Sequence, residues 1–160
     1  MQKIHFSVQI NAPVKKVWDT MIGKESYSIW TKPFCPAGSR FEGDWSEGSE
    51  ICFIGVDEKT GKEMGGMYSR IKENRPCKFI SIEHIGMLNP DGTVDTQSEE
   101  VKKWTPAFEN YTFVEKNGVT EVTIDQDMSE EYTPMFEEMW PKALQALKEL
   151  TEDYENNPGQ

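Results

Sequence analysis

The chain begins with hydrophobic and polar residues in strict alternation. Residues 4–10 place an isoleucine, phenylalanine or valine at every second position, which is the pattern of a β-strand with one buried face. Asn11 and Pro13 follow, and these residue types are common at the first positions of a helix. Hydrophobic residues then recur at helical spacing over 14–21, and Gly23 ends the segment. The segment predicts a strand that leads into an amphipathic helix.

Short β-type segments separated by turn sequences fill most of the middle of the chain. A second short helix over 25–30 and a loop rich in proline and glycine over 31–39 precede them. Strands are predicted over residues 40–45, 50–56, 63–73, 78–88, 108–115 and 119–127. Asn117-Gly118 is a strong hairpin signal between the last two. Gly65-Gly66 has no phosphate-loop context, and within a strand it predicts a bulge or a sharp bend.

One long amphipathic helix is predicted near the C-terminus. Its hydrophobic residues lie on one face between Met135 and Leu150, and Pro141 predicts a kink near Trp140. A sheet with one dry face must be covered, and this is the only long amphipathic helix in the sequence. We therefore expect an α+β fold in one domain over residues 1–160, with a curved antiparallel sheet of about six to seven strands wrapped around the C-terminal helix and one or two short helices after the first strand.

Several segments resemble the SRPBCC superfamily, whose members include START-like and birch-pollen-allergen-like proteins. Residues 4–18 are similar to its opening strand, which ends in Ala-Pro before a helix that carries Val-Trp, and residues 140–148 are similar to its C-terminal helix. Residues 83–86, 98–104 and 109–112 resemble the bacterial branch grouped with the C-terminal domain of the activator of the heat-shock-protein-90 ATPase. The resemblance implies a helix-grip fold. It leaves function open, because the superfamily includes lipid carriers, cyclases, oxygenase domains and co-chaperone modules.

The composition narrows the possible partners. The net charge is -11, so the field of the protein repels nucleic acids and anionic membrane surfaces, and we expect neither as a partner. No stretch approaches the length of a membrane-spanning helix and the N-terminus lacks the apolar run of a signal peptide, so we expect a cytoplasmic protein without membrane insertion. The three cysteines form no C-x-x-C pair and the two histidines are far apart, so we expect no metal, cofactor or disulfide.

Large aromatic residues on separate elements predict an apolar cavity between the sheet and the long helix. The predicted ligand-binding residues are Trp30, Phe34, Trp45, Phe53, His84, Trp104, Tyr111 and Trp140. Trp104 lies in the long connection over 89–106, where it is placed to close the mouth of a cavity. The alternative is that these rings simply fill the core.

His84 is the polar residue with the most chemical interest, because it shares a strand face with Ile80 and Ile82. It is either a ligand-binding or catalytic group, or a core histidine satisfied by a backbone carbonyl or by an acid such as Glu109. We expect the protein, as a monomer or homodimer, to bind an apolar or amphipathic small molecule without catalysis. The alternatives are a co-chaperone-like module that binds a partner protein, and a cyclase or lyase that uses His84 and an acidic residue.

Overall fold

A computed structural model describes the backbone of residues 1–156 and the side chains of residues 1–153. The elements, in chain order, are β1 (Gln2–Ile10), α1 (Val14–Ile22), α2 (Lys24–Trp30), β2 (Ser39–Gly43), β3 (Glu50–Val56), β4 (Glu63–Arg75), β5 (Phe79–Leu88), β6 (Val94–Asp95), α3 (Glu99–Lys102), β7 (Ala107–Lys116), β8 (Val119–Met128) and α4 (Thr133–Asn156).

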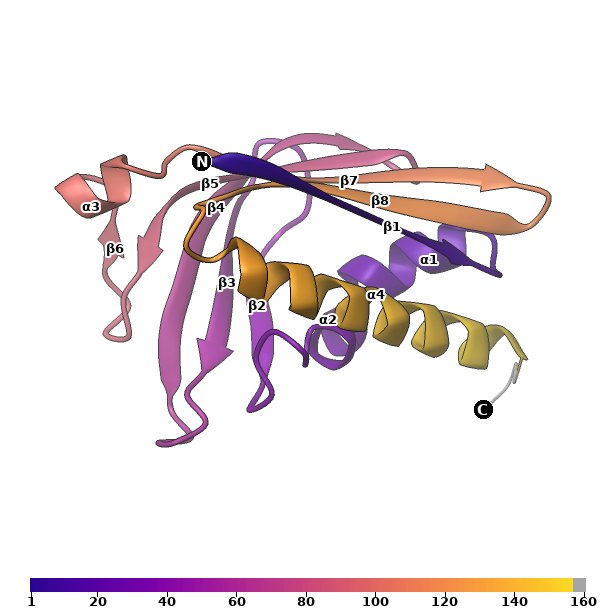
Figure 1. The fold of residues 1–160 in the computed structure, drawn as a ribbon, viewed down its shortest axis with the longest axis horizontal. Coiled ribbons are helices and arrows are strands. Elements are labelled where there is room, and N and C mark those ends of the chain that lie inside the picture. Colours follow the sequence, from indigo (N-terminus) through magenta and orange to yellow (C-terminus); the bar gives the residue numbers. More distant parts are fainter. Residues whose placement is uncertain (157–160) are drawn as a thin grey trace.

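The strands form one antiparallel sheet in the order β1-β8-β7-β5-β4-β3-β2, with the short β6 paired to β5. The sheet bends over α4, and α1 and α2 lie on the same side of it as α4 (Figure 1). The fold is therefore the helix-grip arrangement expected from the sequence. The hairpin between β7 and β8 is also as predicted, because Asn117 and Gly118 both have positive φ angles, of 52° and 80°, as the preferred two-residue turn requires.

A bulge bends the sheet at the glycine pair of β4. The pairing of β3 with β4 shifts register between Ile54 and Val56. Gly65 has a φ of 81°, and a Cβ atom at Gly66 would lie 1.8 Å from the carbonyl oxygen of Phe53. Only glycine tolerates such a close approach of two backbones, so the bend predicted for this pair is present and has a steric cause.

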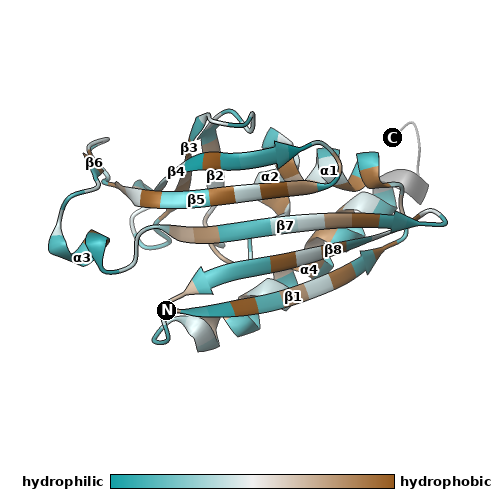
Figure 2. Ribbon diagram, turned by 90° about the horizontal axis from the view of Figure 1, so that it is seen from above, coloured by the Kyte–Doolittle hydropathy of each residue, from teal (hydrophilic) through white to brown (hydrophobic). Residues whose placement is uncertain are grey.

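The concave face of the sheet and one face of α4 form the core. Hydrophobic residues alternate with hydrophilic ones along β1, β5 and β7 (Figure 2), and the concave side carries fully buried residues such as Ile80, Ile82 and Ile124. Trp140 is 2% exposed and packs against Phe6 of β1. α4 is continuous through Pro141, and it packs against β1, α1 and α2.

The connection between β5 and β7 contains the predicted helical turn. Ser98 caps α3, since its side chain accepts a hydrogen bond from the Val101 backbone nitrogen at 3.3 Å. Val101 is the buried residue of this short helix. β6 and α3 project from one end of the sheet (Figure 1), and this end is where the sheet is left uncovered by α4.

Packing of α4 on the sheet is expected to supply a large part of the stability. Leu147 is fully buried on α4, so Leu147→Ala should lower the free energy of unfolding by about 2–5 kcal/mol through lost burial and a residual cavity. Glu137 is exposed on the same helix. Glu137→Ala should therefore change the free energy of unfolding by less than about 0.5 kcal/mol. Urea unfolding of both variants measures the difference. Equal effects would contradict the position given to α4.

Candidate functional site

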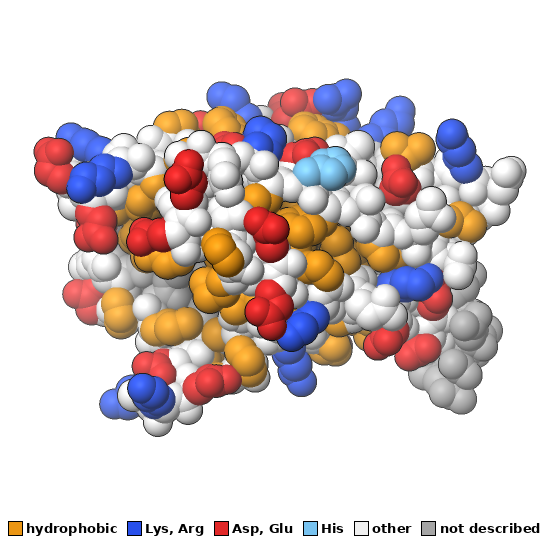
Figure 3. Space-filling model, viewed as in Figure 1, with side chains coloured by type: hydrophobic (Ala, Val, Ile, Leu, Met, Phe, Trp, Pro, Cys, Tyr) orange, Lys and Arg blue, Asp and Glu red, His pale blue; other side chains and the backbone are white. Residues whose placement is uncertain are grey.

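A pocket of about 1190 Å³ lies between the concave face of the sheet, the loop after α2, α3 and the first half of α4. On the face seen in Figure 3, hydrophobic side chains gather to the left of centre, where the surface is hollowed. Seven of the eight predicted ligand-binding residues line this pocket: Trp30, Phe34, Phe53, His84, Trp104, Tyr111 and Trp140. Trp45 does not line it. Its ring packs against Phe41 and Phe53 inside the core.

Aromatic rings form one wall of the pocket. The ring centroid of Trp140 lies 4.9 Å from that of Phe34, 6.2 Å from that of Trp30 and 6.3 Å from that of Tyr111. Trp30 is held in place by a hydrogen bond from its indole nitrogen to the Met21 carbonyl at 3.0 Å. The rings come from α2, its following loop, β7 and α4, so the wall forms only in the folded chain.

Tyr27 also lines the pocket, and the sequence analysis missed it. Its ring contacts those of Trp30 and Phe53. Burial raises the pKa of Tyr27, and the nearby Glu109 carboxylate adds to the effect. The signal that could have found it is its spacing of three residues from Trp30 on a helix, which places both rings on one face.

His84 is buried and both of its ring nitrogens have partners. Nδ1 lies 2.6 Å from the Ser69 hydroxyl, and Nε2 lies 3.0 Å from Oε1 of Glu109. The Glu109 side chain is 14% exposed, so the carboxylate reaches the pocket from a largely dry position. Pairing with Glu109 is the arrangement that the sequence analysis gave for a satisfied core histidine.

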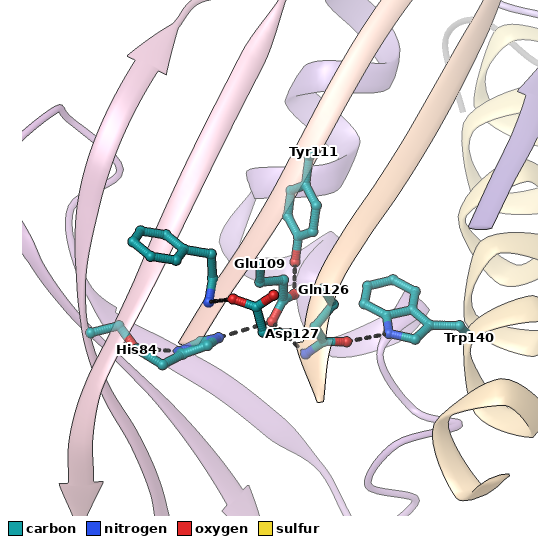
Figure 4. Close-up of polar contacts among 8 residues, drawn as sticks. His84, Glu109, Tyr111, Gln126, Asp127 and Trp140 are labelled. Atoms are coloured by element: carbon teal, nitrogen blue, oxygen red, sulfur yellow. Dashed lines mark hydrogen bonds and ion pairs between the residues drawn. The ribbon is translucent and has the colours of Figure 1, made fainter. Parts of the chain in front are cut away.

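Glu109 lies at the centre of a row of hydrogen bonds that crosses the sheet (Figure 4). The Tyr111 hydroxyl donates to its Oε2, and Nε2 of Gln126 donates to its Oε1 at 3.2 Å. Oε1 of Gln126 in turn accepts from the indole nitrogen of Trp140 at 2.7 Å. The row therefore connects β4, β5, β7 and β8 with α4 through side chains alone.

The register of the last hairpin puts these groups side by side. The turn at Asn117-Gly118 pairs Lys116 with Val119, and the ladder runs without a shift to the pair Glu109 and Gln126. Directly paired residues of antiparallel strands point to the same face. The sequence analysis named Glu109 as an acid near His84 but missed Gln126, although the hairpin signal carried enough information to place it.

Burial and the Glu109 carboxylate raise the pKa of Tyr111 well above its ordinary value. Tyr111 therefore stays protonated and serves as a hydrogen-bond donor.

α3 and the segment before α4 contribute carboxylates to the lining, among them Glu100 and Glu131. Trp104 lines the pocket after α3, and its closing of the mouth stays a prediction. Within residues 1–153, no group of three or more histidine, cysteine, aspartate or glutamate side chains is arranged to hold a metal ion. None of the helices in the described part of the chain is long and apolar enough to cross a membrane.

A curved antiparallel sheet that grips a C-terminal helix, with a pocket between them, defines a START-like protein. The family model described as activator of Hsp90 ATPase homolog 1-like protein matches residues 11–152. The chain therefore belongs to this family.

Solved structures support the fold assignment. A protein of Cytophaga hutchinsonii is 21% identical with a TM-score of 0.68, over 98% of this chain and 97% of that one. Protein NE0264 of Nitrosomonas europaea is 15% identical with a TM-score of 0.73, over 96% of each chain. A protein of Arthrobacter aurescens is 14% identical with a TM-score of 0.71, over 94% of this chain and 86% of that one. No curated protein matched the sequence.

The raised pKa of Tyr111 predicts a loss of stability at alkaline pH. An unfolded tyrosine ionises near about pH 10, whereas folded Tyr111 keeps its proton, so the unfolding free energy should fall as the pH rises above that value. Tyr111→Phe should make this fall shallower, without abolishing it, because Tyr27 behaves in the same way. Urea unfolding between about pH 9 and pH 11 measures the slope. An unchanged slope would show that Tyr111 is not buried as described.

Proposed function

We propose that this protein binds an apolar or amphipathic small molecule in the pocket between the sheet and α4. The observation that carries the proposal is the pocket itself, whose volume of about 1190 Å³ is sufficient for a drug-sized or lipid-like ligand. A domain interior is normally packed without voids larger than a water molecule. A hollow of this size beside an otherwise well-packed core therefore favours a binding role over mere filling by the aromatic rings.

The lining supports an amphipathic ligand. The rings of Trp30, Phe34 and Trp140 offer an apolar wall, and the row around Glu109 offers polar atoms at one place on the floor. A few oriented polar groups in a mainly apolar concavity are typical of ligand sites. The apolar body of the ligand would lie against the rings, and its polar end would meet Glu109.

A reaction on the bound molecule is the second candidate function, and the pair of His84 and Glu109 is the observation in its favour. His84 holds the carboxylate at 3.0 Å, and a carboxylate in a dry site is suited to take a proton from a carbon next to a carbonyl group. In such a cyclase or lyase Glu109 would accept the proton, and His84 would position it.

Filling the pocket should abolish binding without unfolding the protein. Met67 lines the pocket from β4, whereas its neighbour Tyr68 points to the other face of the sheet. Met67→Trp should weaken binding of the uncharged apolar dye N-phenylnaphthylamine by at least about tenfold, since its larger ring displaces the dye.

Tyr68→Trp is the matched control and should leave the affinity within about threefold of the original value. Dye fluorescence gives the affinity, and thermal unfolding shows that both variants are folded. A dye that binds all three proteins equally, or none of them, would count against the pocket as the binding site.

The second candidate predicts proton exchange on a bound ketone. In deuterated buffer the protein should accelerate the loss of the α-proton signals of β-tetralone, an apolar ketone, in nuclear magnetic resonance spectra. Glu109→Gln should remove the acceleration, because an amide cannot accept the proton. Glu83 lies on the opposite face of β5, so Glu83→Gln should retain it. Exchange at the rate of buffer alone would exclude this function for such ketones.

A further inference from the structure

We propose that the ligand is a cationic amphiphile, an apolar molecule that ends in an amine whose ammonium group binds the Glu109 carboxylate. This inference rests on the proposed binding function and goes further by assigning the charge of the ligand. Its basis is the combination of a dry carboxylate with an open acceptor position, a lining with an excess of negative charge, and aromatic rings next to the carboxylate.

The carboxylate of Glu109 has room for one more donor. A carboxylate offers about four acceptor positions, and three are filled, two on Oε1 by His84 and Gln126 and one on Oε2 by Tyr111. The remaining position is on Oε2. Because the side chain is 14% exposed and lines the pocket, a ligand in the pocket can reach it.

Two of the three side chains bonded to Glu109 are neutral. Gln126 is neutral, and Tyr111 stays protonated because its pKa is raised. His84 is the third, with its Nε2 3.0 Å from Oε1 of Glu109 and its Nδ1 2.6 Å from the Ser69 hydroxyl. A carboxylate with little exposure is stabilised by positive charge close to it. An ammonium ion of the ligand, at the open position on Oε2, would place such a charge there.

The rest of the lining favours a cation. Six carboxylates line the pocket: Asp95, Glu99, Glu100, Glu109, Asp127 and Glu131. Lys103 is the single lysine or arginine among the described lining residues, and Lys3 pairs with Asp127 at 2.9 Å from outside the lining. A cleft lined mainly by one sign of charge concentrates ligands of the other sign. A fatty acid would instead bring its carboxylate towards Glu109.

Two aromatic side chains belong to the same row of hydrogen bonds through their polar edges. The Tyr111 hydroxyl is bonded to Glu109, and the Trp140 indole is bonded to Gln126, which is bonded to the same carboxylate. The two ring centroids are 6.3 Å apart. These contacts fix the carboxylate beside the aromatic wall of the pocket, where the apolar body of the ligand would lie. The open hydrogen-bond position and the charge of the lining thus agree on one ligand class.

Three ligands with the same alkyl chain test the inference: dodecylamine, dodecanol and dodecanoate, each kept at neutral pH below the concentration at which it forms micelles or separates from solution. Displacement of N-phenylnaphthylamine from the pocket reports binding at this site, and calorimetry gives the affinity. Dodecylamine should bind at least about tenfold more tightly than dodecanol, and dodecanoate should bind most weakly.

Glu109→Gln should bring dodecylamine to within about threefold of dodecanol, while Glu83→Gln on the opposite face of the sheet should preserve the preference. If Glu109→Gln does not fold, the affinities of the original protein for the three ligands still show whether it prefers a cation. Dodecanol or dodecanoate binding as tightly as dodecylamine, or a preference that survives in folded Glu109→Gln, would overturn the assignment and leave the binding function intact. Failure of the dye and of all three ligands to bind would overturn both.

Discussion

The placement of Trp140 against the concave face of the sheet is the contact on which the other features depend. Its ring packs against Phe6, Trp30, Phe34 and Tyr111, and its indole nitrogen donates to Gln126. One side chain thus joins α4 to β1, β7, β8, α2 and the loop after α2. Because α4 makes its main strand contacts with β1, it covers one side of the sheet. The other side, where β2 to β4 bend away (Figure 1), becomes the wall of an open pocket.

Burying the row of polar side chains in the apolar face of the sheet costs free energy. Hydrophobic side chains would pack this face without that cost. Isoleucine or leucine at the positions of His84, Glu109 and Gln126 would fill the same face without burying polar atoms, and such replacements are often neutral or stabilising. Each polar atom of the row has a partner, apart from the open position on Glu109. A satisfied network with one open acceptor position beside a pocket has the form of a ligand site.

The arrangement of the sheet and of α4 could be predicted from the sequence, but only part of the site could. Alternation, the Asn117-Gly118 turn and the helical face over 135–150 were sufficient for the sheet and for α4, and hairpin register links Glu109 with Gln126. Ser69 was out of reach, because a register shift between Ile71 and Glu73 determines that it pairs with His84. Trp45 was placed in the pocket because periodicity shows which residues turn inward. It does not show whether the interior at that point is filled or hollow.

The geometry also assigns different tasks to His84 and Glu109. Both nitrogens of His84 are occupied by Ser69 and Glu109, so the imidazole cannot form a hydrogen bond with a ligand without breaking one of these bonds. Glu109 has an acceptor position left and partial access to the pocket. Of the two groups, the carboxylate therefore has the open hydrogen-bond position, and His84 holds and orients it. A bound ammonium group would fill the last open acceptor position of Glu109, and that position is the one that would take a proton. The two candidate functions therefore use the same residue and require different ligands.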